Sequence, residues 1–150
     1  MITVFGEEEY KGVIRQDRLL ENYYVSRCGD VYSTFSNKIL KQHLRGNPEN
    51  YGNVYNYVMI PHPDKKRHTY NLAVHRIVME TWKPIDKYPP EQLKDDWDKA
   101  PQSFKDWVKQ TAWVDHIDGD SSNNHIDNLR WVTPRQNHWI LKSQEKDNEG

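Results

Sequence analysis

Two short apolar runs flank a polar loop in the last third of the chain. Residues 112–116 (AWVDH) and 129–132 (LRWV) have the length and the aromatic and β-branched content of strands. Between them, residues 118–124 (DGDSSNN) are Asp, Gly, Ser and Asn, which favour turns and loops. Residues 133–136 (TPRQ) then carry the signals of a helix start: an N-cap Thr, a Pro at the first helical position and a Gln that closes a capping box. The pattern predicts strand, loop, strand and helix.

The first half of the chain predicts antiparallel strands followed by a helix. Residues 1–20 are acidic and give no information on secondary structure, whereas residues 23–33 predict two short strands around a Gly-Asp turn. Further strands are predicted over residues 38–44, 56–60 and 69–72. Residues 73–82 predict a helix with Asn71 as its cap and an apolar stripe formed by Val74, Ile77, Val78 and Trp82.

Residues 83–110 form a charged, Pro-containing segment that separates this helix from the strand–loop–strand unit. The segment holds six basic and six acidic residues and predicts short helices over residues 91–97 and 102–110. A structural cover over the core is the favoured interpretation, and a lid that faces a ligand is the alternative. Residues 144–150 are predicted to be disordered.

Composition narrows the classes of protein that fit. A chain of 150 residues makes one domain, or one domain with an arm, and can bury a real core. The single cysteine, Cys28, excludes internal disulfides and any structural zinc site held by Cys pairs. No apolar run has the length of a membrane span and the N-terminus lacks a signal-peptide pattern, so we expect a cytoplasmic protein.

Charge is divided unevenly along the chain. The formal net charge is −1, but residues 21–82 hold eight bases and five acids, whereas residues 111–150 hold four bases and seven acids. Contacts to phosphate are therefore expected mainly from the N-terminal half. The candidates are a basic cluster between two predicted strands and three further arginines: Lys65, Lys66, Arg67, Arg76, Arg130 and Arg135. For the cluster, ordinary solvated surface is the equal alternative.

The strand–loop–strand unit contains residues suited to cutting a phosphodiester. A histidine titrates near neutral pH, so His116 can accept the proton of an attacking water. Asp115 and Asn137 offer hard oxygen ligands, few in number, which suit Mg²⁺ or Mn²⁺ better than zinc. Strict alternation would send Asp115 and His116 to opposite faces, so both serve one site only if the strand ends there.

These residues resemble the motif of the HNH endonucleases, specifically the phage and intron-encoded homing enzymes. The matching positions are Asp115, His116, Gly119, Asn128, Leu129 and Asn137. The third residue of the H-N-H motif is Asn137 here rather than His, a variant that also occurs in the family. The resemblance implies a ββα-metal unit in which His116 is the general base and Asp115 and Asn137 hold the metal. It also implies that Asn128 braces the loop behind His116. The strands near residue 30 and the Val-His-Arg pattern at residues 74–76 resemble segments that precede the motif in this family.

Several alternatives stay open. Asp118, Asp120 and Asp127 could bind metal, but turn solvation is favoured. An EF-hand is excluded because the loop has no closing Glu and no preceding helix. For His75, packing or a contact near phosphate is favoured over metal ligation. Unlike most relatives, the chain carries the insert at residues 83–110 and stops soon after Lys142, so no helical DNA-reading arm is expected.

The sequence thus predicts an α+β fold in four segments: a β-rich DNA-contacting module with a helix (1–82), a helical insert (83–110), the HNH ββα-metal unit (111–143) and a tail (144–150). The expected function is a metal-dependent DNA endonuclease, phage-encoded, that acts on duplex DNA as a monomer and nicks one strand per site; a dimer is the alternative assembly. The rival functions are a catalytically silent HNH-derived nucleic-acid-binding module and an RNA-processing nuclease.

Overall fold

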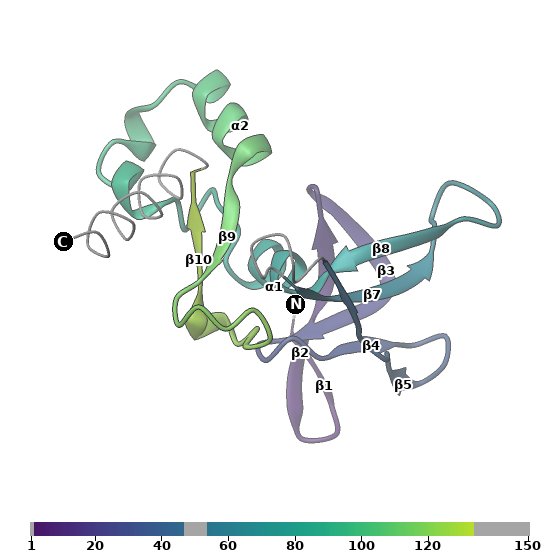
Figure 1. Ribbon diagram of the computed structural model, residues 1–150. Helices are drawn as coiled ribbons and strands as arrows, with labels where there is room; N and C mark the ends of the chain where they lie inside the picture. Colours follow the sequence, from purple (N-terminus) through teal and green to yellow (C-terminus); the bar gives the residue numbers. More distant parts are fainter. Residues whose placement is uncertain (1, 47–53, 134–150) are drawn as a thin grey trace.

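The computed structural model describes residues 2–46 and 54–133 and shows an α+β fold (Figure 1). Within these residues three antiparallel sheets surround one helix, α1 (Val74–Trp82). No helix in this part of the chain is long and apolar enough to cross a membrane.

The first sheet has the strand order β1-β2-β3-β4-β5. Its strands are β1 (Ile2–Phe5), β2 (Glu8–Arg15), β3 (Arg18–Ser26), β4 (Val31–Ser33) and β5 (Lys38–Ile39). The predicted hairpin over residues 23–33 is confirmed, and residues 1–20, which were uninformative in sequence, form β1, β2 and the start of β3. A bulge between Gly12 and Ile14 separates the buried Tyr10 and Val13 by three positions, which hides the alternation that marks a strand.

The second sheet has the order β6-β7-β8, with β6 (His43–Arg45), β7 (Tyr55–Pro61) and β8 (Thr69–Ala73). The single strand predicted over residues 38–44 is therefore wrong, because β5 and β6 lie in different sheets. Gln42 lies at the break, where its side chain donates 2.9 Å to the Gly29 carbonyl and accepts 2.9 Å from Asn56 Nδ2. Such long-range contacts redirect a chain that contains no local turn signal.

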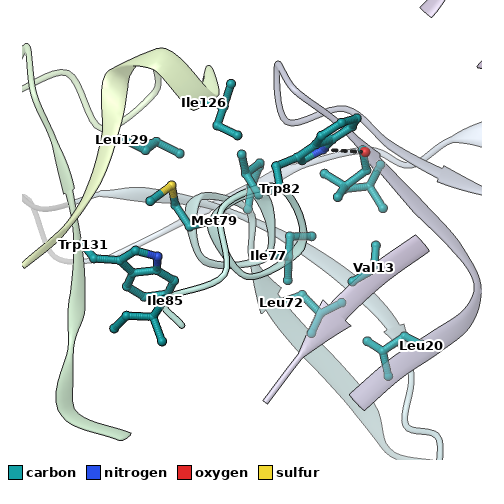
Figure 2. Close-up of a cluster of buried hydrophobic side chains, with 14 of the residues drawn as sticks. Val13, Leu20, Leu72, Ile77, Met79, Trp82, Ile85, Ile126, Leu129 and Trp131 are labelled. Carbon is teal, nitrogen blue, oxygen red and sulfur yellow. Dashed lines mark hydrogen bonds between the residues drawn. The ribbon is translucent and has the colours of Figure 1, made fainter. Parts of the chain in front are cut away.

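Helix α1 lies between the sheets and the C-terminal hairpin. Its predicted apolar stripe is confirmed as buried, but Asn71 is not its cap: Asn71 lies in β8, and the N-cap Ala73 makes no side-chain bond. Figure 2 shows Ile77 directed toward Val13 and Leu72 of the sheets, and Met79 on the side of Leu129 and Trp131 of the hairpin. One core therefore joins the N-terminal module to the hairpin.

The insert contributes to the same core. Its elements are η1 (Glu91–Leu93), η2 (Trp97–Lys99) and α2 (Gln102–Thr111), so the helix predicted over residues 91–97 is replaced by two short 3₁₀ turns and the helix over 102–110 is confirmed. Ile85, Trp97 and Val108 are buried in the core. This packing is what a structural cover requires.

The C-terminal hairpin consists of β9 (Trp113–His116) and β10 (Leu129–Val132), joined through a loop and η3 (Ile126–Asn128). The strands are antiparallel, with His116 opposite Leu129 and Asp115 opposite Arg130. The predicted strand–loop–strand arrangement is confirmed. The predicted helix lies outside the described residues, together with Arg135, Asn137 and the tail.

Candidate active site

Strand β9 ends at His116, which is the condition for Asp115 and His116 to serve one site. The amide of Ile117 still bonds the Asn128 carbonyl at 2.8 Å, and the amide of Gly119 then turns back to the His116 carbonyl at 2.9 Å. Gly119 has φ +77°, a left-handed conformation that glycine adopts without steric cost. The backbone therefore reverses immediately after the histidine.

Asn128 ties the loop together from its closing end. Its Oδ1 accepts from the Asp118 amide at 3.0 Å, and its Nδ2 donates at 2.9 Å both to the Asn123 carbonyl and to Asp118 Oδ1. These bonds to backbone groups behind His116 are those expected from the family resemblance. Asn128 therefore bonds to both ends of the loop, at Asp118 and at Asn123.

The loop carboxylates are engaged by donors of the loop itself. Asp118 accepts from Asn123 Nδ2 and the Asp120 amide, and Asp120 accepts from both the hydroxyl and the amide of Ser122. The hydrogen bond from Asn123 is the main reason that the pKa of Asp118 is lowered, and the bond from the Ser122 hydroxyl is the main reason that the pKa of Asp120 is lowered. Both carboxylates therefore have the turn-stabilising contacts that the sequence favoured for them.

His116 is 8% exposed and is held by a side chain that the sequence did not single out. Its Nε2 lies 2.8 Å from Oδ1 of Asn124, which is itself only 5% exposed. The other ring nitrogen of His116, Nδ1, makes no hydrogen bond in the described part of the chain. It is also not one of the buried polar atoms that lack a partner there. Asn124 was missed because an Asn in a polar loop looks like turn chemistry; only its burial reveals the contact.

Two further rings lie beside His116, and both come from the N-terminal module. Tyr55 is stacked on the imidazole, with ring centroids 5.9 Å apart and an interplanar angle of 23°, and His75 lies 5.3 Å away. Burial and then the charges of Tyr57 and Asp115 raise the pKa of Tyr55. Asp115 therefore contributes to the electrostatic environment of the tyrosine that packs on His116.

Asp115 is paired with its cross-strand neighbour. Arg130 Nε donates a hydrogen bond of 2.8 Å to Asp115 Oδ2. The side chain of Asp115 is 27% exposed and that of Arg130 is 47% exposed. Arg130 thus neutralises the carboxylate at the strand end. This carboxylate supplies the hard oxygen chemistry that Mg²⁺ prefers, which fits the expected ligand role. Among the described residues no group of three or more His, Cys, Asp or Glu is arranged to hold a metal.

The loop of the hairpin is docked on the N-terminal module. The Ile126 amide donates 2.8 Å to the Arg27 carbonyl, and the Ser121 hydroxyl donates to the Val54 carbonyl. Gly29, with φ +94°, lies so close to Asn124 that a Cβ would be 3.2 Å from the Asn124 Cβ. Residues from both halves of the chain therefore build this site.

The candidate DNA-contacting residues fall into two environments. Lys65, Lys66 and Arg67 are exposed in the long connection between β7 and β8, which extends from the body of the molecule in Figure 1. Arg76 instead lies in the joint between α1 and the hairpin, where its Nη1 donates 2.7 Å to the Ala112 carbonyl and its guanidinium lies over Trp131. Arg76 therefore has a structural position, and the exposed turn is the better candidate for a contact with phosphate.

Comparisons with known proteins bear on the hairpin and on the whole chain. Residues 108–139 match the HNH endonuclease family. An HNH endonuclease of Acanthamoeba polyphaga mimivirus, L245, itself uncharacterized, is 25% identical over 134 residues, which are 89% of this chain and 30% of the viral protein. Protein 3.8 of Escherichia phage T7 is 40% identical over 43 residues, which are 29% of this chain and 36% of the phage protein. The chain thus spans about a third of the length of these relatives.

A solved structure resembles most of the chain. The HNH homing endonuclease I-HmuI, in a structure that describes its DNA binding and cleavage, matches 91% of this chain and 59% of its own, with a TM-score of 0.56 and 26% identity. Because it covers 91% of the chain, the match extends well beyond the hairpin. The family match to residues 108–139, the viral relative and the likeness of nearly the whole chain to a homing endonuclease all support the HNH endonuclease family for this protein.

Proposed function

We propose that this protein is a metal-dependent DNA endonuclease that hydrolyses phosphodiester bonds and cuts one strand per site. The observation that carries the proposal is the setting of His116: a histidine at a strand end, oriented by a buried amide and flanked by a carboxylate. The likeness to a homing endonuclease supports DNA as the substrate class.

Asn124 determines which nitrogen of His116 is available as a base. Because Asn124 Oδ1 is the acceptor at 2.8 Å, Nε2 carries the hydrogen, and Nδ1 keeps the lone pair that can take a proton from water. A general base must have a free lone pair within reach of the proton that it removes. The neutral, Nε2-protonated tautomer of His116 is the form that meets this requirement.

The metal would be held by Asp115 together with Asn137, which lies outside the described residues. A bound Mg²⁺ would supply charge neutralisation at the phosphate and the leaving oxygen. In this structure the guanidinium of Arg130 occupies one oxygen of Asp115, at 2.8 Å. Arg130 would hold this carboxylate in its orientation, and with Arg135 it would contact phosphate. Asn128 would keep the loop in shape while His116 accepts the proton.

A binding module without catalysis is the second candidate, since an HNH fold can hold DNA without cutting it. The retained Asp115, His116 and Asn137 favour the nuclease, because binding alone does not require all three. Supercoiled plasmid incubated with the protein in Mg²⁺ and in EDTA separates the two. Nicking with Mg²⁺ that EDTA abolishes supports the nuclease. Binding to the plasmid without nicking in Mg²⁺ or Mn²⁺ contradicts it and favours the binding module.

A further inference from the structure

The rings of Tyr55 and His75 form, with His116, a three-ring cluster that crosses from the N-terminal module to the hairpin. Tyr55 is the first residue of β7, and His75 is the second residue of α1. The centroid of Tyr55 lies 4.8 Å from that of His75 and 5.9 Å from that of His116, and the two histidines are 5.3 Å apart. Each ring therefore contacts the other two.

The rest of the structure fixes this cluster in place. Pairing of β7 with β6 and β8 places Tyr55 opposite Arg45, and Tyr57 opposite Ala73. The Ser121 hydroxyl bonds the carbonyl of Val54, so the loop that follows His116 is fastened one residue from Tyr55. The imidazole of His116 is consequently bounded by a ring face on one side and held through Nε2 by Asn124.

A histidine at position 75 destabilises the fold more than an apolar residue would, if it serves only to fill the core. Its Nδ1 is buried and has no hydrogen-bond partner among the described residues. Burial lowers the pKa of His75 to about 3, so the ring is neutral at working pH. A buried polar atom without a partner destabilises a fold, and a phenyl ring would occupy the same space without that cost. Its position against His116 is thus better explained by the active site than by stability.

We infer that Tyr55 and His75 are positioning residues that hold the plane of the His116 imidazole, so that the N-terminal module completes the active site of the HNH unit. The inference rests on the proposed function of His116 as the base. Their rings act by contact, since Nδ1 of His75 is buried and Tyr55 packs through its face. Replacing Tyr55 or His75 with another aromatic residue should therefore preserve the orientation of the His116 ring, and replacing either with an aliphatic residue should not.

The test compares kcat and KM for plasmid nicking in Tyr55→Phe, Tyr55→Leu, His75→Phe and His75→Ala. A base that loses its orientation loses rate, so we expect Tyr55→Leu and His75→Ala to lower kcat by roughly tenfold to a hundredfold. KM should stay close to that of the wild type, and the two Phe variants should keep most of kcat. The matched control is Tyr70→Leu, because Tyr70 packs on His62 at the far end of the same sheet, with centroids 5.2 Å apart. Its kcat should equal that of the wild type.

Two results would overturn the inference: a normal kcat in Tyr55→Leu and His75→Ala, or Phe variants as impaired as the aliphatic ones. A second measurement separates it from the proposed function. The carbon-bound proton signals of the His116 ring should shift in the NMR spectrum of Tyr55→Leu, through loss of the stacked ring, and stay fixed in Tyr70→Leu. A wild-type protein that cuts no DNA would refute the proposed function alone, whereas unmoved His116 signals in Tyr55→Leu would refute the ring contact whatever the activity.

Discussion

Asn124 is the residue whose contacts most constrain the chemistry of His116. Asn124→Leu keeps the volume but removes the acceptor for Nε2, and Asn124→Asp keeps the acceptor and removes the amide donor. We expect the Leu variant to cleave roughly tenfold to a hundredfold more slowly and the Asp variant to retain most of its activity. Cleavage rates at saturating DNA, with NMR of the His116 ring nitrogens as a check on the tautomer, measure this. An Asp variant as slow as the Leu variant would show that Asn124 acts as a donor.

Gly29 supports Asn124 from behind. A Cβ at Gly29 would lie 2.9 Å from Val74 Cγ1 and 3.2 Å from Asn124 Cβ, on a backbone with φ +94°. Gly29→Ala should therefore lower the free energy of unfolding by about 1–3 kcal/mol and slow cleavage, since Asn124 must shift. Gly6→Ala is the matched control: φ is +67° but the space is open, so a smaller loss of stability and normal cleavage are expected. Denaturant unfolding of both variants measures the difference, and an equal loss in the two would contradict the contact.

Only part of the site could be predicted from residue types and spacing. Asp115, His116 and Asn128 stand at motif positions, and the loop bonds of Asn128 agree with its expected bracing role. Asn124, Tyr55 and His75 could not be assigned in this way, because what they do depends on contacts between segments far apart in sequence. Arg76 was expected at phosphate and is instead engaged with Ala112, because its helix packs against the hairpin.

At the scale of elements, local sequence patterns predicted those helices and strands that keep a regular pattern of apolar and polar residues along their length. The apolar stripe predicted α1, and the strand predicted over residues 56–60 lies within β7. Prediction failed where a long-range contact decides the backbone: the bulge in β2 breaks the alternation, and Gln42 divides one apparent strand between two sheets. The local sequence contains no signal for the bulge or for the break at Gln42, because both depend on contacts with distant residues.

The connection between β7 and β8 carries the most direct prediction about DNA. Lys65, Lys66 and Arg67 are all exposed there. Replacing the three with Gln should weaken binding to any duplex and reduce the slope of log K against log salt, by up to about 0.9 for each lost phosphate contact. Fluorescence anisotropy over a salt series measures the slope, with Lys94→Gln in the insert as a single-charge control. A slope unchanged from the wild type would make the cluster ordinary surface.

For the whole molecule, the single hairpin motif determines the expected product. The chain contains one copy of the motif, and one site can cut both strands of a duplex only by rebinding or through a symmetric dimer. Supercoiled plasmid should therefore become open circle first, with linear DNA appearing late or only at high protein concentration. Gel analysis of a time course measures this order. Linear DNA without an open-circle intermediate, with a steep dependence on protein concentration, would indicate a dimeric double-strand cutter instead.

The central claim is that His116 is the base of a DNA-cleaving site, and His116→Ala tests it most directly. Cleavage rate and DNA affinity are measured side by side, the rate on supercoiled plasmid in Mg²⁺ and the affinity in EDTA. Loss of a general base lowers the rate by roughly 10²–10⁴, and affinity should stay close to that of the wild type because the phosphate contacts that we propose come from other residues. Near-normal cleavage by the His116→Ala protein, with wild-type affinity, would contradict the account.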